Sequence, residues 1–193
     1  MRTYSAAISR IRPVTSWGVG ILLCALLPIE RAAAVNGVSV DSGYGLADTR
    51  LLRFSFSLSD NRRTPENNGW SWYHYWEANL SYWYLYKNKE GVDDLFELGI
   101  TPNIRVERDK AWAWGGRPYM EAGLGVHLLS TIYIGNRDLG SSFQFGTHVG
   151  VGIRFGSREQ LEFAWRVEHL SNADLAQPNP GINFSMLRFG YHW

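Results

Sequence analysis

His169 and Ser171 stand two positions apart near the end of the 193-residue chain. A histidine beside a serine hydroxyl can act as the general base that activates a nucleophile, which is the chemistry of ester hydrolysis. On an extended strand, residues i and i+2 share one face and lie roughly 6.5 Å apart, so an imidazole can reach the hydroxyl. The alternative is that both are ordinary polar residues at the end of a strand. The elements that position them decide between these interpretations.

Apolar and polar residues alternate with a period of two along nearly all of the chain after position 35. In the segment that carries the histidine and serine, the apolar row is Leu161, Phe163, Trp165 and Val167, and the intervening residues are mostly charged. Eight strands are predicted from this pattern, at about 37–45, 50–59, 70–86, 94–107, 117–129, 141–156, 160–171 and 183–193.

These strands have the character of a membrane barrel. They are long, at roughly 10 to 14 residues against a usual 5 to 6 in soluble domains. Their polar faces are rich in glycine and in both charge signs, and aromatic residues, 15% of the chain, crowd the strand ends. The fold class is therefore predicted to be all-β, an eight-stranded antiparallel transmembrane β-barrel of the bacterial outer membrane. Side chains just fill so narrow a barrel, so chemistry must lie in loops, at the mouth or on the outer wall.

The first 34 residues are predicted to be a cleaved signal peptide rather than part of the barrel. Arg2, Arg10 and Arg12 precede the apolar run WGVGILLCALL, and Ala32 and Ala34 form an A-x-A cleavage pattern. An uncleaved anchor is the alternative. Residues 35–193 then form the barrel domain, and this mature chain lacks cysteine, which suits an exported protein without disulfides.

Strand phase gives the direction of the candidate pair. His169 and Ser171 continue the apolar row of their strand, so both are expected to face lipid, and Asn183 falls on the same face of the next strand. With both termini in the periplasm, the loop at 172–182 is extracellular and the site lies at outer-leaflet depth. Polar groups at that boundary carry a desolvation cost unless they are paired, which favours a functional role.

The stretch EHLSNADLAQPNPGINFSMLRFGY resembles the C-terminal region of the lipid A 3-O-deacylase (PagL) family, and two preceding strands, PYMEAGLGVHLLS and DLGSSFQFGTHVGVGIRF, resemble that family as well. The resemblance implies an outer-membrane esterase that hydrolyses the 3-hydroxyacyl ester at the 3-position of lipid A, a modification of lipopolysaccharide. It implies Ser171 as the nucleophile and His169 as the general base. Asn172 and nearby backbone N–H groups would form the oxyanion hole, and no cofactor or metal is implied.

Two positions depart from the family's pattern. Asn183 stands where the triad acid, a glutamate in the best-known members, is expected. An asparagine can orient a histidine but cannot stabilise the imidazolium by charge. Asp174 stands where a small residue is expected, and its carboxylate could repel an oxyanion or supply charge to the histidine. Glu168 is expected to point into the barrel, away from the site.

Weaker signals leave alternatives open. Phe145 could line an acyl-chain groove or simply face lipid, and Lys87 and Lys89 could contact lipid A phosphates or be solvated loop charges. A net charge of +1 argues against nucleic acid as a partner, and a homodimer is compatible with the sequence. The alternative function is a non-enzymatic barrel for adhesion, membrane integrity or lipopolysaccharide binding, and a third is another lipid-directed enzyme such as a phospholipase or acyltransferase.

Overall fold

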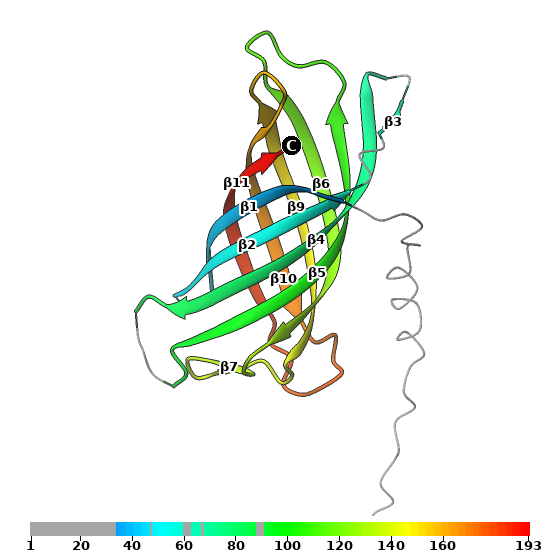
Figure 1. The fold of residues 1–193 in the computed structure, drawn as a ribbon. Coiled ribbons are helices and arrows are strands. Elements are labelled where there is room, and N and C mark those ends of the chain that lie inside the picture. The colour runs from blue at the N-terminus through cyan, green and yellow to red at the C-terminus, as the bar shows by residue number, and fades with distance from the viewer. Residues whose placement is uncertain (1–33, 47, 60–62, 67, 88–90) are drawn as a thin grey trace, which may run out of the picture.

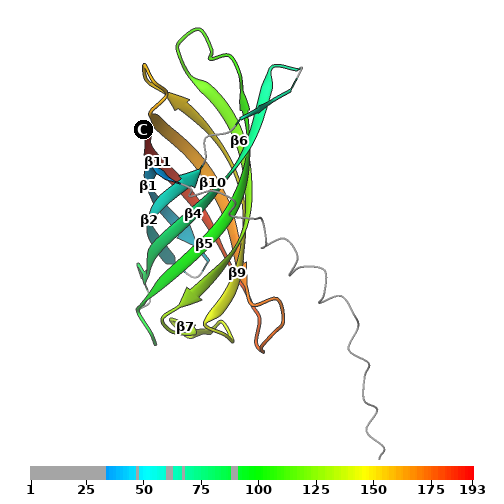
Figure 2. The same cartoon turned by 45° about the vertical axis from the view of Figure 1, so that its right-hand side comes forward.

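A computed structural model of the protein describes residues 34–193, except 47, 60–62, 67 and 88–90. Its strands wrap into a tall barrel with loops at both ends (Figures 1 and 2). The signal peptide predicted at 1–34 lies outside the described residues, apart from Ala34, which begins the first strand. The strands are β1 (Ala34–Gly45), β2 (Thr49–Ser59), β3 (Thr64–Pro65), β4 (Trp70–Leu85), β5 (Asp94–Arg108), β6 (Arg117–Leu129), β7 (Tyr133–Ile134), β8 (Arg137–Asp138), β9 (Phe143–Phe155), β10 (Leu161–Ser171) and β11 (Ile182–His192).

Eight long antiparallel strands close the barrel, in the order β2-β1-β11-β10-β9-β6-β5-β4, with β4 pairing back to β2. The predicted eight-stranded fold is confirmed, and each predicted strand end agrees with the structure within three residues. The alternation did not predict β3, β7 and β8. Each has only two residues, too few for a periodic pattern.

The interior of the barrel is filled by ion pairs. Arg166 contacts Glu77 at 3.0 Å and Glu121 at 2.5 Å, and Arg188 contacts Asp41 at 2.8 Å and Glu77 at 2.6 Å. Neighbouring layers are built in the same way from Arg53 with Glu97 and Glu168, and from Arg105 with Glu121 and Glu162. A buried charge is tolerated when it is paired and hydrogen-bonded, so this network lets charged side chains fill the lumen.

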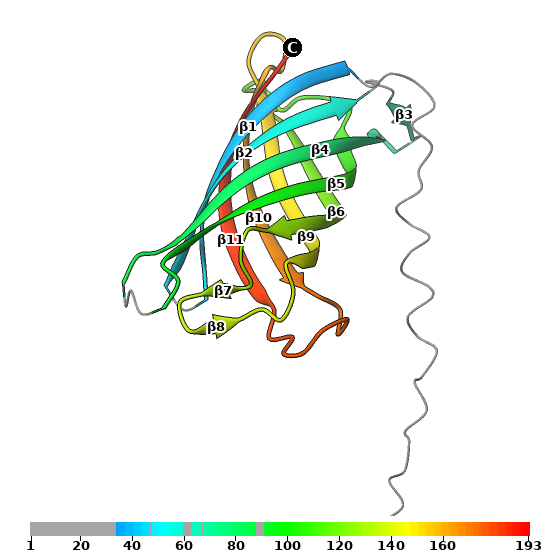
Figure 3. The ribbon, with the colours of Figure 1, turned by 60° about the horizontal axis from the view of Figure 1, so that its bottom comes forward.

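One end of the lumen is instead apolar. Buried residues from six long strands meet there under the β7–β8 hairpin: Leu51, Trp83, Leu85, Leu95, Leu129, Ile134, Leu139, Leu170, Ile182, Phe184 and Met186. Figure 3 brings this end forward and shows the hairpin beside the loop between β10 and β11. The chain's C-terminus lies at the other end (Figure 1). The apolar cluster gives the hairpin and the loop a firm base.

The outside of the wall is largely apolar. On β11, Leu187, Phe189 and Tyr191 alternate outward with exposed fractions of 48%, 64% and 43%, while Arg188 between them is 1% exposed. The outward row of β10 is built in the same way from Leu161, Phe163 and Trp165. In the part of the chain that the structure describes, no helix is long and apolar enough to cross a membrane.

Candidate active site

His169 and Ser171 lie where β10 ends, on its outward face. The inward neighbours Leu170 and Asn172 are fully buried, whereas His169 is exposed and Ser171 is half-buried. Across the ladder, His169 pairs with Asn183 of β11 and Ser171 pairs with Phe145 of β9. The structure therefore brings together four of the residues singled out from the sequence on one patch of the outer wall.

The His169 ring is held by Asn183. Its Nδ1 lies 2.6 Å from Asn183 Oδ1. Because an amide oxygen can only accept a hydrogen bond, Nδ1 carries the proton and Nε2 carries the lone pair. A histidine in this tautomer can take a proton through Nε2, as a general base must.

Ser171 keeps its hydroxyl free. No hydrogen bond joins Ser171 Oγ to His169 or to any other residue that the structure describes. The side chains share one face of the strand at i and i+2, a separation that rotation about the serine side chain can close. In hydrolases without substrate the corresponding hydrogen bond is often long and tightens when substrate arrives. Phe145, opposite Ser171, meets Phe143 edge-on at 5.1 Å between ring centroids and makes an apolar wall beside the hydroxyl.

Asn172 lies next to Ser171 but faces inward, and it has no N–H left for a substrate. Its side-chain Nδ2 donates to Leu139 O at 3.1 Å and to Pro178 O at 3.3 Å. Its backbone N–H donates to Asn179 Oδ1 at 2.9 Å. Asn172 therefore shapes the loop, and the oxyanion donors predicted there must come from neighbouring backbone N–H groups.

A tight turn over residues 172–175 presents such groups. Leu175 N donates to Asn172 O at 3.1 Å, and the central residues Ala173 and Asp174 have φ of 53° and 61°, as in a type I′ turn. Such a turn uses only the N–H of its fourth residue. The N–H groups of Ala173 and Asp174 have no partner among the described residues.

The Asp174 carboxylate is drawn into its own loop. Its Oδ1 accepts from Asn179 Nδ2 at 3.1 Å and from Gln177 Nε2 at 3.4 Å. No hydrogen bond or ion pair links it to His169 within the described ranges. Glu168, the other nearby acid, points inward as predicted and binds Arg53 at 2.7 Å. Neither carboxylate takes the orienting position, which Asn183 holds.

Arg137 of the β7–β8 hairpin binds the loop next to His169, a contact that the sequence patterns did not reveal. Arg137 donates to Gly181 O at 2.6 Å and to Pro180 O at 3.1 Å. Gly181 has φ of 57°, and a Cβ there would lie 2.7 Å from His169 Cε1. Arg137 thus holds the loop so that Gly181 backs the imidazole.

Among the residues that the structure describes, no three His, Cys, Asp or Glu side chains are grouped to hold a metal ion. What the site offers is a serine hydroxyl and a histidine with a fixed tautomer on the outward face of the wall, and in the next turn two backbone N–H groups without a partner among the described residues. These are the parts of a serine hydrolase centre without an acidic third member.

Comparison with known proteins identifies the family of the chain. Residues 49–192 match the family model described as lipid A 3-O-deacylase (PagL). The chain is 30% identical over 117 residues to the lipid A deacylase PagL of Bordetella bronchiseptica, with 61% of each chain covered. It is 30% identical over 173 residues to the lipid A deacylase PagL of Pseudomonas aeruginosa, covering 81% of this chain and 92% of that one.

A solved structure agrees at the level of the fold. The crystal structure of the outer membrane enzyme PagL superposes with a TM-score of 0.70 at 27% identity, covering 81% of this chain and 99% of the other. The family match includes seven of the eight barrel strands in full and every residue of the site described above. This protein belongs to the lipid A 3-O-deacylase (PagL) family.

Proposed function

We propose that the protein is an outer-membrane serine esterase that hydrolyses the 3-hydroxyacyl ester at the 3-position of lipid A. The observation that carries the proposal is the hydrogen bond from His169 Nδ1 to Asn183, which directs the basic Nε2 to the face that Ser171 shares. This pair opens to the outside of the wall, the side from which a lipid substrate must approach. Lipid A is the substrate named for both relatives.

The chemistry has two steps. In the first, Ser171 Oγ attacks the ester carbonyl while His169 Nε2 takes the serine proton. The tetrahedral oxyanion accepts hydrogen bonds from the backbone N–H groups of Ala173 and Asp174. The bond to the sugar oxygen then breaks, and His169 returns the proton to that oxygen, leaving an acyl-serine and a free 3-hydroxyl on the sugar.

In the second step, water replaces the sugar. His169 Nε2 takes a proton from the water as it attacks the acyl-serine carbonyl, and collapse of the second oxyanion releases a 3-hydroxy fatty acid and restores Ser171. Phe145, next to Ser171 in the ladder, contributes to the apolar surface against which the acyl chain lies. No cofactor takes part in this sequence.

The site belongs to the outer leaflet in this proposal. The described residues of the β1–β2, β4–β5, β6–β9 and β10–β11 connections lie at the end where β10 terminates, opposite the C-terminus. A barrel with an even number of strands and periplasmic termini places those loops outside the cell. His169 and Ser171 then meet lipopolysaccharide, the lipid of that leaflet.

Asn183 sets the efficiency of the mechanism. It fixes the tautomer and direction of His169, which is the orienting part of a triad acid's work. It carries no charge to stabilise the imidazolium that forms when Ser171 is deprotonated. The proposed enzyme is therefore a Ser-His hydrolase with an orienting amide, and turnover below that of a carboxylate triad is expected.

The experiment is an assay of purified, refolded protein with lipid A, followed by mass spectrometry of the lipid and the released acid. Wild type should release a 3-hydroxy fatty acid, and Ser171→Ala and His169→Asn should each abolish the release. Full activity of either variant would sink the mechanism. Absence of any release from wild type would favour a non-enzymatic barrel, and a different released product would indicate another lipid-directed enzyme.

A further inference from the structure

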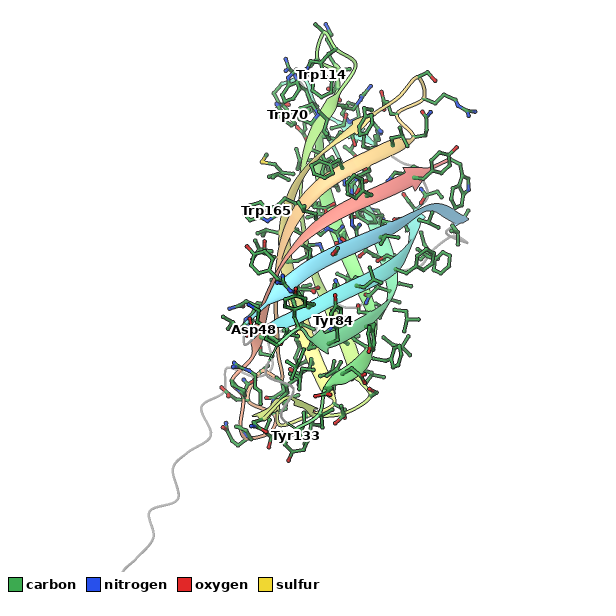
Figure 4. The ribbon with its side chains drawn as sticks, turned by 90° about the vertical axis from the view of Figure 1, so that its left-hand side faces the viewer. Asp48, Trp70, Tyr84, Trp114, Tyr133 and Trp165 are labelled. Carbon is green, nitrogen blue, oxygen red and sulfur yellow. The ribbon has the colours of Figure 1, made fainter. Side chains whose placement is uncertain are left out.

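A groove on the outer wall lies beside the proposed catalytic site. It has a volume of about 660 Å³ and crosses the outward faces of β10, β11, β1, β2 and the end of β4. Trp165, four residues before His169 on the same face of β10, forms one side, and Tyr84 of β4 lies on the other. Figure 4 shows these two residues with β11 and β1 passing between them. The groove is therefore continuous with the wall that carries the reactive pair.

Arg50 gives this groove a positive charge. It points outward near the start of β2, and no carboxylate in the described part of the chain lies within ion-pair distance of it. Arg53, three residues further along β2, points inward and is bound by Glu97 and Glu168. A guanidinium on the lipid side of a barrel is unfavourable unless it meets an anion or the headgroup region. Arg50 is thus a cation whose counter-charge is absent from the protein itself.

Aromatic rings hold Arg50 in place. Its guanidinium carbon lies 5.9 Å from the Tyr44 ring centroid and 5.2 Å from that of Tyr86. Lys87 also lies near the Tyr86 ring, with Nζ 5.9 Å from the centroid; Lys89 lies outside the described residues. Cation–π contacts restrict the side chain without using its N–H donors. The donors of Arg50 therefore stay available in a fixed direction, which favours planar, bidentate recognition of a phosphate.

The other side of the groove offers neutral polar groups. Trp165 Nε1 donates to Ser185 Oγ at 2.8 Å, and Ser185 follows Asn183 by two positions on the outward face of β11. The serine hydroxyl can still donate its proton. Hydroxyls and aromatic faces together suit a sugar, which presents hydroxyls around its edge and C–H groups on its faces.

The spacing also suits a headgroup. Across the ladder Arg50 lies opposite Val167 of β10, three strand spacings away at about 14 Å, and His169 lies two residues, about 7 Å, further along β10. Lipid A is an acylated glucosamine disaccharide that carries phosphates, so an ester and a phosphate on one molecule can be this far apart. We infer that the groove binds the phosphorylated sugar headgroup of lipid A, with Arg50 holding a phosphate while the 3-acyl ester lies at Ser171. The inference rests on the proposed function and adds the subsite that selects its substrate.

The test compares two substrates and matched arginine variants. Lipid A with its phosphates and the same lipid A after phosphate removal are presented in identical detergent micelles. For Arg50→Ala, the ratio of kcat/KM between phosphorylated and dephosphorylated substrate should fall about 10-fold or more, the loss expected for hydrogen bonds to a charged group. Arg50→Lys should fall in between. Arg158→Ala is the control, because Arg158 is an exposed arginine in the turn between β9 and β10, at the opposite end.

A binding arm separates this inference from the proposed function. In the Ser171→Ala background, which does not turn over lipid, adding Arg50→Ala should weaken binding of phosphorylated lipid A about 10-fold relative to the dephosphorylated form. An unchanged ratio in both the kinetic and the binding arms would overturn the headgroup subsite while leaving the deacylase intact. If wild type releases no acid from either substrate, the proposed function fails, and the binding arm alone still decides whether Arg50 recognises phosphate.

Discussion

The two faces of β10 treat polar side chains in opposite ways. Facing inward, Arg166 is 0% exposed and binds Glu77 and Glu121, and Glu168 is 1% exposed and binds Arg53. Facing outward, His169 makes one side-chain hydrogen bond to the described residues and Ser171 makes none to them. On the inward face, the charged groups use their hydrogen-bonding capacity within the fold. On the outward face, Ser171 Oγ and His169 Nε2 remain available to a bound molecule.

The difference separates stability from chemistry. A charge in the lumen would cost several kcal/mol if it were unpaired, so the inward row is tolerated only because it is paired. Unsatisfied polar groups at a lipid boundary are also unfavourable, and the fold gains nothing from Ser171 or from His169 Nε2. The proposed reaction, in which a substrate uses both groups, would account for their presence. The comparison predicts that changes on the two faces have separable consequences.

The largest effect is expected from Ser171→Ala. Turnover of lipid A should fall on the order of 10⁴-fold or more, as in other hydrolases that lose their nucleophile. Stability should change by less than about 0.5 kcal/mol, because the hydroxyl makes no hydrogen bond to any residue that the structure describes. Initial rates of acid release and urea unfolding in detergent measure the two quantities.

Ser142→Ala provides the matched control, since Ser142 is an exposed serine at the same end of the barrel. It should leave both rate and stability unchanged. Normal turnover of lipid A by Ser171→Ala would contradict a functional role for this outward-facing serine.

Arg166→Leu, a change on the inward face, should lower the stability of the protein. This change removes the guanidinium that Glu77 and Glu121 share, at 3.0 and 2.5 Å. Glu77 keeps Arg188 and Glu121 keeps Arg105, but the buried cluster loses one positive charge. Breaking a buried pair by removing one partner costs roughly 3–5 kcal/mol. The free energy of unfolding in urea should fall by about that amount, with Arg158→Ala as the exposed control. An unchanged unfolding midpoint would show that the lumen network contributes little.

Strand phase explains why the directions of the side chains on β10 could be predicted from the sequence. A strand has only two faces, so one apolar row decides which way every residue points. The outward direction of His169 and Ser171 and the inward direction of Glu168 all follow from that single choice. The eight strands followed for the same reason, because the alternation runs through each of them.

Contacts between loops could not be predicted in this way. Arg137 reaches the carbonyls of Pro180 and Gly181, 43 and 44 residues away, and Asn172 reaches the carbonyl of Leu139, 33 residues away. Every residue has a backbone carbonyl, so such partners leave no signature in the sequence. The free N–H groups after Ser171 depend on a type I′ turn, which Ala173 does not favour because its φ is positive. The pairing of Asn183 with His169, in contrast, followed from strand phase.

The third prediction concerns Gly181, which lies against the His169 ring. Gly181→Ala should lower kcat about 10-fold or more, because a Cβ would lie 2.7 Å from His169 Cε1 and displace the ring. Gly115→Ala is a matched control: Gly115 also has a positive φ, of 88°, but nothing lies within 4 Å of its Cβ position. Both variants carry the backbone strain, and only one touches the histidine. Equal kcat values for the two variants would show that Gly181 does not position His169.

Asn183→Glu tests whether the outward pair lacks only a charge. A carboxylate at this position would keep the hydrogen bond to His169 Nδ1 and stabilise the imidazolium. We expect kcat to rise by about 10-fold, since the orienting part of the work is already done by asparagine. Asn183→Leu, which removes the hydrogen bond, should lower kcat and serves as the opposing control. If Glu and Asn gave equal rates, another group would have to orient the histidine.

The smallest effect is expected from Asp174→Gly. Glycine relieves the left-handed backbone at φ 61°, worth about 1 kcal/mol, but removes the hydrogen bonds that Asn179 and Gln177 donate to the carboxylate. These terms oppose each other, so unfolding in urea should shift by less than about 1 kcal/mol. Turnover should rise by roughly 2- to 3-fold, because a negative charge beside the developing oxyanion is removed. Ala173→Gly relieves the same strain at φ 53° without changing any charge. A rise confined to Asp174→Gly therefore assigns the effect to the carboxylate, whereas an equal rise in both variants assigns it to the backbone.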